Sequence, residues 1–336
     1  MFSTTVDNFD FAGYLSKTQT SRHKLTTPLE HLGGTIERLF GTRKDTAPRL
    51  PWGDIDFQMR PHECTVWAGA NGHGKSMVTS QVMLDLMTNN FKVGLASFEM
   101  TPEALNGRLI RQAAGGLPAQ DYAIRLMEWM EDKIWYAAKQ GSTKVEEVMG
   151  MVRFAARERA VNHFFIDNLM CCVKGEDDMN AQKEFIQGCC TIARDEGIHV
   201  HIVHHVRKLE DDIKIPSKFD IKGSSTITDL VDNVILVIRN KKKERDLELT
   251  KTEEDRAKLR SEKPDTMLLI DKQRHGTGDH SEGRVKLWYH GDSNSYHGHQ
   301  LLRRPFGFEI PESAEVEVKT EAVMESLPFQ ESELFE

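Results

Sequence analysis

Short continuous apolar runs alternate along this chain with stretches in which apolar residues recur every three or four positions. The runs have the length of buried β-strands, and strands apolar on both faces are typical of a parallel sheet covered by helices on each side. Such runs lie at Cys64–Ala68, Lys92–Glu99, His163–Asp167, Asn233–Ile238 and Thr266–Ile270. The intervening stretches have the period of amphipathic helices, as at Met77–Met87 and Lys144–Ala160. The pattern therefore predicts an α/β fold with a mostly parallel, twisted sheet and helices on both faces.

Turn and capping residues place some boundaries of these elements. Thr101 and Pro102 predict a helix start, and Gly115-Gly116 predict its end. Residues 121–140 are amphipathic with the helical period, so we expect one helix there. Near the end of the pattern, Arg284–Tyr289 and Ser295–Gln300 predict an antiparallel finish to the sheet.

The pattern also divides the chain into three parts. Residues 1–54 hold only short helical stretches, and we expect an arm that packs loosely on the body or docks on a neighbouring subunit. Residues 55–305 form the α/β domain, in which the charge-dense segment 240–264 predicts a solvated hairpin or helical insertion. Residues 306–336 are acidic and poor in core residues, which predicts a disordered tail.

Composition narrows the class of protein. The chain of 336 residues contains no apolar run of about 18 residues, the length that a membrane-spanning helix requires. Its N-terminus lacks the basic-then-apolar layout of a signal peptide. The five cysteines include two adjacent pairs and no C-x-x-C spacing, which favours buried thiols in a reducing cytoplasm over a zinc ribbon. We therefore expect a cytoplasmic protein.

The net charge of −8 is concentrated at the C-terminus, because the segment from Glu309 to Glu336 contains nine Glu and one Lys. The remaining chain is balanced in charge and can contain a basic channel, so overall acidity does not exclude a nucleic-acid partner. The tail mixes acids with apolar residues, which is equally typical of a docking peptide for a basic partner and of a solubilising segment.

The strongest chemical signal directly follows the first apolar run. Its eight residues fit the phosphate-binding pattern G-x-x-x-x-G-K-[ST], in the order Gly69, Ala70, Asn71, Gly72, His73, Gly74, Lys75, Ser76. Strand, glycine loop and helix are the context that this motif requires. Backbone amides and the helix start would bind phosphate, Lys75 would reach the β- and γ-phosphates, and Ser76 would hold Mg²⁺.

Two acidic residues end other predicted strands. Asp167 closes His163–Asp167 about 90 residues after the glycine loop, which is the Walker B pattern for polarising a water on Mg²⁺. Asn168 follows it where many ATPases have a catalytic Glu, so the general base must come from elsewhere. Glu99 is the candidate, because the carboxyl ends of parallel strands meet at one ligand crevice.

The run His199–His205 alternates as a strand and carries four histidines. His199, His201 and His205 share a face, which fits either a zinc site or, as we favour, packing in the core. His205 ends the strand, where a neutral imidazole can donate a hydrogen bond to a γ-phosphate.

Cations gather in two later segments. The polar stretch 207–225 fits contact with a phosphate backbone or an ordinary surface loop, and its candidate contacts are Arg207, Lys208, Lys222, Gly223, Ser224 and Ser225. Lys272 and Arg274 lie at i and i+2 on a strand and should point the same way. The always-charged fork of Arg274 suits the stabilisation of a phosphoryl-transfer transition state.

In order along the chain, these stretches resemble the hexameric replicative helicases of the DnaB-like family, with their RecA-like P-loop NTPase core, and especially the phage and mitochondrial branch. The resemblance covers roughly residues 55–300 and includes the following motifs: Gly69–Ser76, Ala96–Thr101, His163–Leu169, Val203–Arg207, the DNA-loop motif Phe219–Asp229, and the pair Lys272 and Arg274. It does not extend to a primase half or a helical collar, for which residues 1–54 are too few.

The resemblance implies a homohexameric ring that binds ATP and Mg²⁺ at its subunit interfaces and moves 5′ to 3′ on single-stranded DNA. It implies that Glu99 activates water, that His205 senses phosphate, and that Lys272 and Arg274 enter the neighbour's ATP site. A replisome protein is a candidate partner for the acidic tail. Two alternatives remain open from the sequence: a filament-forming recombinase, and a regulatory or loader ATPase that does not unwind DNA.

Overall fold

The computed structural model describes residues 9–18, 27–40, 47–52, 55, 57–137, 143–169, 178–207, 215–222, 226–276 and 283–298. Its strands are β1 Cys64–Gly69, β2 Val93–Ser97, β3 Ile134–Ala137, β4 His163–Asp167, β5 His199–His205, β6 Asn233–Arg239, β7 Thr266–Gln273, β8 Arg284–His290 and β9 Ser295–His297. Its helices are α1 Phe11–Thr18, η1 Pro28–His31, α2 Leu32–Phe40, α3 Lys75–Thr88, α4 Pro102–Ala114, α5 Gln120–Met130, α6 Val145–Glu158, α7 Met179–Glu196, η3 Lys218–Asp220, α8 Thr226–Leu230, α9 Lys241–Leu249 and α10 Glu253–Glu262.

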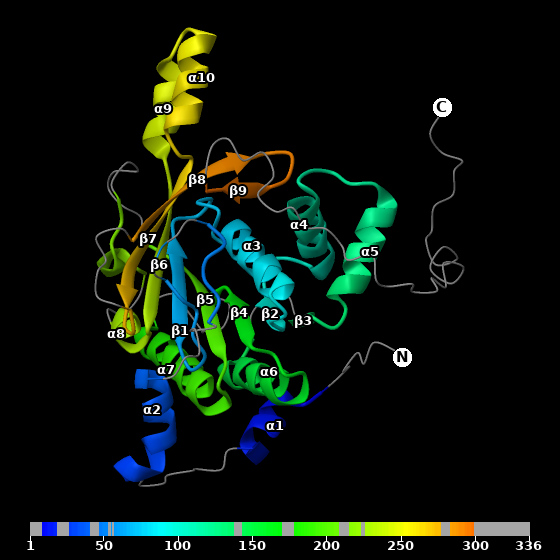
Figure 1. Ribbon diagram of the computed structural model, residues 1–336, viewed down its shortest axis with the longest axis vertical. Helices are drawn as coiled ribbons and strands as arrows, with labels where there is room; N and C mark the ends of the chain where they lie inside the picture. The colour runs from blue at the N-terminus through cyan, green and yellow to red at the C-terminus, as the bar shows by residue number, and fades with distance from the viewer. Residues whose placement is uncertain are drawn as a thin grey trace.

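In the described residues the strands form one sheet in the order β3-β2-β4-β5-β1-β6-β7-β8-β9 (Figure 1). From β3 to β6 neighbouring strands are parallel, and from β6 to β9 they are antiparallel. The predicted α/β fold, mostly parallel with an antiparallel finish, is confirmed. Parallel pairing brings the carboxyl ends of β1, β2, β4 and β5 to one edge of the sheet, which we call the carboxyl edge.

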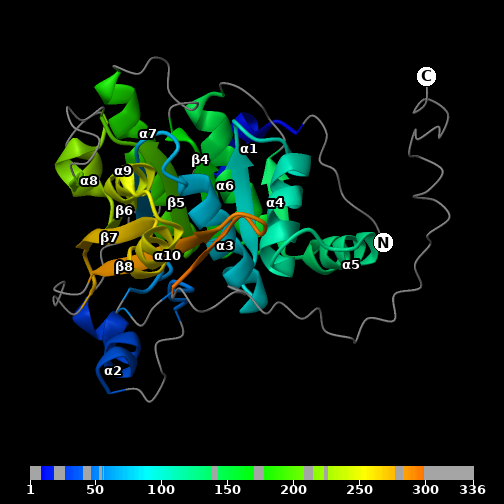
Figure 2. The ribbon, with the colours of Figure 1, turned by 90° about the horizontal axis from the view of Figure 1, so that it is seen from above.

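Helices cover both faces of the sheet, as the view from above shows (Figure 2). Alternate residues of β1 face opposite ways: Val66 and Ala68 join the core under α6 and α7, while Trp67 joins the core under α3 and α4. Burial on both sides explains why β1 reads as a continuous apolar run in the sequence.

Local capping fixes the helix that follows β2. The Thr101 hydroxyl accepts a hydrogen bond from the amide of Ala104 at 3.3 Å, and Pro102 occupies the first turn. Gly115 ends the helix with a φ of 72°, a left-handed conformation that glycine adopts at little steric cost. The predicted start and end of α4 are therefore confirmed.

The single helix predicted over residues 121–140 is wrong in its second half. Helix α5 ends at Met130, and β3 then pairs in parallel with β2, with Ile134 opposite Val93. Ile134, Trp135 and Tyr136 are β-branched or aromatic residues that suit a strand. Pairing with the edge of β2 satisfies their backbone groups, so tertiary contact prevails over the helical period of the apolar positions.

The strand histidines form a hydrogen-bonded row inside the core. Nε1 of Trp67 donates to Nδ1 of His201 at 3.2 Å, so Nε2 of His201 carries the proton and donates to Nδ1 of His163 at 3.1 Å. The Thr65 hydroxyl donates to Nε2 of His199 at 2.8 Å, while Nδ1 of His199 donates to a backbone carbonyl. The contacts of His163 and His201 need neutral rings, and burial lowers the pKa of all three histidines. This row supports the packing interpretation of the strand.

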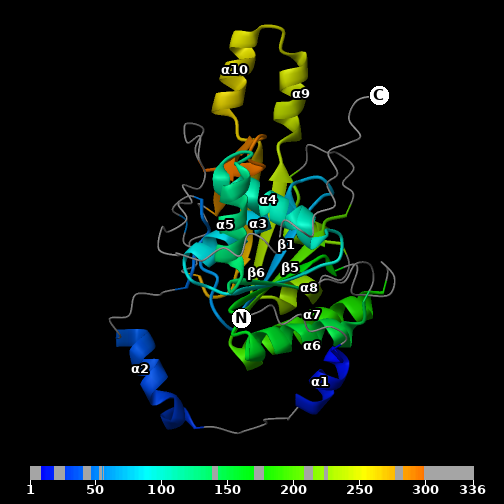
Figure 3. The ribbon, with the colours of Figure 1, turned by 90° about the vertical axis from the view of Figure 1, so that its right-hand side faces the viewer.

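Two segments lie outside the sheet and its covering helices. In the N-terminal arm, α1 packs on α6 through tilted and edge-on ring contacts of Phe9, Phe11 and Tyr14 with Phe154. Helix α2 lies apart from the sheet in Figures 1 and 3. The charged insertion is a helical hairpin, α9 and α10, that projects from the end of β6 (Figure 3). The acidic tail lies outside the described residues.

Candidate functional site

The glycine loop lies at the carboxyl edge, between the end of β1 and the first turn of α3. Gly74 has a φ of 85°, and a Cβ there would also collide with the hydroxyl of Tyr296. A Cβ on Gly69 would meet the carbonyl oxygen of Val237 at 2.5 Å. These two positions therefore require glycine, and the loop turns its backbone toward the start of α3, where an anion is favoured.

Lys75 is the buried cation of this loop, with 7% of its surface exposed. Its Nζ donates to the carbonyl oxygens of Gly69 and Ala70 at 2.9 and 3.1 Å and lies 3.2 Å from Nδ1 of His205. Burial lowers the pKa of Lys75 to about 8, although Asp167 and Glu99 act in the opposite direction. The ammonium thus occupies a place where phosphate oxygens would be stronger acceptors than the loop carbonyls.

Ser76 and Asp167 meet beside Lys75. A hydrogen bond joins the Ser76 hydroxyl to the buried Asp167 carboxylate, whose pKa is raised by burial despite that bond and the nearby Lys75. Hydroxyl and carboxylate oxygens are the ligand type that Mg²⁺ takes, and a divalent ion would supply the positive charge that this buried carboxylate lacks. The pair therefore fits the predicted magnesium site.

Glu99 reaches the same place from the end of β2. The amide of Phe98 donates to the carbonyl of Asp167 at 2.8 Å, which joins the ends of β2 and β4. The Asn168 side-chain amide donates to Oε1 of Glu99 and lies 3.2 Å from Nε2 of His205. The structure thus brings the sequence-predicted residues Lys75, Ser76, Glu99, Asp167 and His205 to one site.

Two further residues join this site and carried no predicted role. Asn168, noted in the sequence only as the replacement for a Glu, holds Glu99 in place. Arg108 on α4 is electrostatically coupled to Asp167 and Tyr289, and burial lowers its pKa. Its buried Nη1 has no hydrogen-bond partner among the described residues. One helical turn later, Gln112 donates to the carbonyl of Met77 at 3.1 Å, so this face of α4 looks onto the start of α3.

The polar stretch after β5 returns to the same edge. Val206 forms an antiparallel bridge with Ile221, and the amide of Lys222 donates to the carbonyl of His205 at 2.9 Å. The ring of His204 contacts the carbonyl of Lys222 at 2.6 Å. Lys222 is therefore tied to the strand that carries His205, while the Arg207 side chain is exposed. Lys208, Gly223, Ser224 and Ser225 lie outside the described residues.

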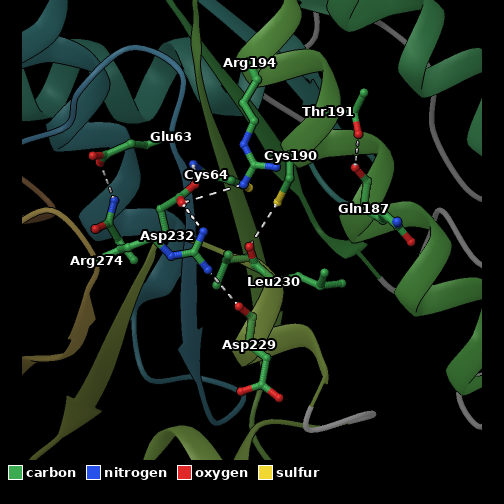
Figure 4. Close-up of polar contacts among 12 residues, drawn as sticks. Glu63, Cys64, Gln187, Cys190, Thr191, Arg194, Asp229, Leu230, Asp232 and Arg274 are labelled. Carbon is green, nitrogen blue, oxygen red and sulfur yellow. Dashed lines mark hydrogen bonds and ion pairs between the residues drawn. The ribbon is translucent and has the colours of Figure 1, made fainter. Parts of the chain in front are cut away.

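Arg274 lies at the opposite end of the parallel strands, where β1 begins (Figure 4), and Lys272 of β7 pairs with Val234 near the start of β6. The guanidinium of Arg274 donates to Oδ1 of Asp232 and to the carbonyl of Asp229, both at 2.9 Å. Oδ2 of the same Asp232 accepts the amide of Cys64, the first residue of β1, at 3.0 Å. The Arg274 side chain remains 37% exposed. The structure does not bring this pair to the glycine loop of its own chain.

Comparison with known proteins agrees with this geometry. The family profile described as AAA domain matches residues 39–211, slightly more than half of the chain. A structure of a DnaB-like replicative helicase and its interactions with primase superposes with a TM-score of 0.63 at 17% identity, covering 81% of this chain and 67% of that one. A second solved structure, of an ATPase domain, superposes with a TM-score of 0.66 at 17% identity, covering 81% of this chain and 99% of that one.

At 17% identity these two structures establish the fold and not the activity. Among the described residues, no helix is both long and apolar enough to cross a bilayer. The glycine loop, the acidic strand ends beside it and the match over more than half of the sequence show that this chain belongs to the AAA domain family and has a RecA-like P-loop ATPase core.

Proposed function

We propose that this protein is an ATP-driven replicative DNA helicase that assembles as a homohexameric ring, hydrolyses ATP between subunits and moves on single-stranded DNA. The likeness of the core to a DnaB-like replicative helicase and to a second ATPase domain supports this proposal. The motifs at Glu99, His205, Lys222 and Arg274 support it as well.

The observation that carries the proposal is the position of Arg274. It lies level with Cys64, and Gly69 follows Cys64 by five positions along the strand, a distance of roughly 16 Å at the usual rise. Arg274 is thus far from its own phosphate loop and is exposed at the opposite end of the parallel strands. An arginine so placed is out of reach of its own nucleotide and accessible to another subunit, which supports a hydrolysis site shared by two protomers.

Within one subunit, the residues at the carboxyl edge have separate roles. Lys75 binds the β- and γ-phosphates, and Asn168 holds Glu99 in position to accept a proton from the attacking water. Ser76 and Asp167 would hold Mg²⁺, which neutralises charge on the phosphate oxygens when it is bound. The burial of Lys75 and Asp167 keeps these charge interactions strong.

The neighbouring subunit contributes Arg274, with Lys272, to the charge that develops on the transferred phosphoryl group. His205 contacts Lys75 on one side and bonds to the Lys222 amide through its own carbonyl. Loss of the γ-phosphate can therefore move the polar stretch that begins after β5.

That polar stretch is the proposed DNA interface. Arg207, Lys208 and Lys222 would neutralise phosphates of one strand, and the backbone at Gly223, Ser224 and Ser225 would approach it closely. Contacts of this kind do not depend on base sequence, as a translocating motor requires. The acidic tail as a docking segment for a replisome partner, and the cytoplasmic location, stay predictions.

The shared site is tested with mixed rings. Glu99→Gln and Arg274→Ala proteins should each bind nucleotide but turn over at least about 10³-fold more slowly than the wild type, because each lacks part of every interface. Rings mixed from both variants contain some interfaces with an intact Glu99 opposite an intact Arg274. ATPase activity should therefore reappear on mixing, measured together with native mass.

The controls decide between this proposal and its alternatives. Mixing two preparations of the same variant should restore nothing. No recovery in verified mixed rings contradicts the shared site. Helical filaments in electron micrographs would favour a recombinase, and wild-type rings that hydrolyse ATP without separating a forked duplex would favour a regulatory or loader ATPase.

A further inference from the structure

Lys272 and Arg274, here called the finger pair, are held by the helix that follows the predicted DNA loop. Nζ of Lys272 donates to the carbonyls of Thr228 and Asp229 in α8, at 2.7 and 3.2 Å, and to that of Val231 directly after the helix, at 2.8 Å. Arg274 shares the Asp229 carbonyl at 2.9 Å. The last carbonyls of a helix lack partners within it and carry partial negative charge, so they are a natural site for cations.

Asp232 completes this site. It is buried, with 4% of its side chain exposed, and its Oδ1 accepts from Arg274 at 2.9 Å. Its backbone carbonyl also accepts the amide of Arg274 at 2.9 Å. A second cation, Arg194 of α7, lies 3.9 Å from the same Oδ1 and competes for its charge (Figure 4). Charged hydrogen bonds of this kind are stronger than neutral ones, so Asp232 dominates the attachment of Arg274.

We propose that Asp232 and the carboxyl end of α8 form a storage site for the finger pair, in which Asp232 is a positioning residue that restrains Arg274 until DNA binds. This inference rests on the proposed function and adds a regulatory step to it. Stored on its own subunit, Arg274 contributes less to the neighbouring nucleotide, and an assembled ring without DNA hydrolyses ATP slowly.

The chain order supplies the link to DNA. Helix α8 starts at Thr226, directly after the predicted contacts Lys222 to Ser225. A strand bound at those residues therefore acts on the first turn of α8, and the last carbonyls of α8 hold the finger pair. A small shift of this five-residue helix changes all its contacts with Lys272 and Arg274 together, which is how a short element can act as a two-state switch.

The test uses the whole chain in assembled rings, with ATPase measured with and without single-stranded oligothymidylate. In Asp232→Asn, the amide oxygen can still accept the Cys64 amide, but the NH₂ group then faces Arg274, a donor against a donor. Release of Arg274 should raise turnover without DNA about tenfold, while turnover with DNA stays within about twofold of the wild type. The ratio of turnover with DNA to turnover without DNA should fall accordingly.

Arg194→Gln should act in the opposite direction. It removes the competing cation from Asp232, so Arg274 is held more firmly, and turnover without DNA should fall about two- to fivefold, with a larger ratio. Asp195→Asn, on the same helix and paired with Arg153 at 3.3 Å, is the matched control and should keep the wild-type ratio. Because Arg194 is largely exposed, its variant also serves if Asp232→Asn does not fold.

The outcomes separate the two proposals. Wild-type rings whose ATPase ignores DNA contradict the proposed helicase and this inference with it. Wild-type rings that respond to DNA, with Asp232→Asn and Arg194→Gln both at the wild-type ratio, overturn the storage site alone. An equal loss of turnover with and without DNA in folded Asp232→Asn also overturns it, because Asp232 would then orient Arg274 permanently.

Discussion

At the scale of single residues, the site depends on charges that the protein isolates from water. Lys75 is buried with a pKa lowered to about 8, and Asp167 is buried with its pKa raised, so each is less stable in its charged form than it would be in water. A nucleotide with its metal ion would relieve both costs by supplying the missing opposite charges. Such a site binds a charged ligand strongly, because the ligand supplies the opposite charges that the buried side chains lack.

Arg108 should be part of that binding. Its buried Nη1 has no partner in the described residues, and it is coupled to Asp167 beside the phosphate loop. Replacing it with Ala should weaken the binding of a non-hydrolysable ATP analogue by about 10- to 100-fold, the usual effect of losing a charged hydrogen bond. Fluorescence titration measures this. Arg125→Ala, whose partner is the exposed Asp121, is the control, and equal affinity in both variants would contradict the assignment.

At the scale of elements, the histidine row links three neighbouring strands, β4, β5 and β1. Burial keeps these rings neutral and each has hydrogen-bond partners, so these strands tolerate polar side chains in a core that is otherwise apolar. The row also makes the sheet sensitive to acid, since a proton added to any of the three rings must enter a buried, already satisfied network.

Folding stability should therefore fall with pH below neutrality. Burial lowers the pKa of His199 to about 4, whereas in the unfolded chain it is near 6.5. Below pH 6.5 His199 binds a proton in the unfolded state but not in the folded state. The free energy of unfolding therefore decreases as the pH falls, until the pH reaches about 4. At pH 5 His199 alone should cost about 2 kcal/mol relative to pH 7.5. Urea unfolding at both pH values measures this.

A matched variant isolates the effect of that histidine. His199→Gln cannot titrate and keeps a side-chain acceptor for Thr65, so its stability should be lower at neutral pH but should fall less steeply with acid. His31→Gln, in the exposed 3₁₀ turn η1, should leave the wild-type pH dependence unchanged. A His199→Gln variant with the full wild-type slope would refute this origin of the acid sensitivity.

At the scale of the whole molecule, the two halves of the proposed reaction site lie at opposite ends of the parallel strands of one sheet. The phosphate loop follows β1 at the carboxyl edge, and Arg274 lies where β1 begins. One subunit cannot bring these two halves together, so the proposed mechanism makes assembly a condition for activity.

Turnover per protomer should accordingly rise with protein concentration. At concentrations where native mass shows monomers, hydrolysis should be at least about 10³-fold slower than in rings, the usual contribution of an arginine supplied in trans. The rise should follow the ring fraction. Arg274→Ala should assemble with the same concentration dependence but gain no activity, and a monomer as active as the ring would rule out the shared site.

The sequence by itself determined the layers of the fold and most of the nucleotide site. Apolar runs and helical periods depend on local geometry, and the glycine loop places Lys75 and Ser76 within a few residues of one strand end. Asp167, Glu99 and His205 were predicted from strand ends, because parallel pairing brings those ends together whatever the side chains between them. The strand β3 was missed because its conformation depends on pairing with β2, which lies more than 30 residues earlier.

Only the tertiary structure decided which side chains share partners. Asn168 and Glu99 are bonded across two strands, and helix packing that no local pattern reveals brings the charge of Arg108 close enough to interact with Asp167. The attachment of Lys272 and Arg274 to α8 and Asp232 depends on antiparallel pairing of β7 with β6. Such contacts join residues that are remote along the chain, and their distances are set by the packing of whole elements rather than by the sequence near each residue.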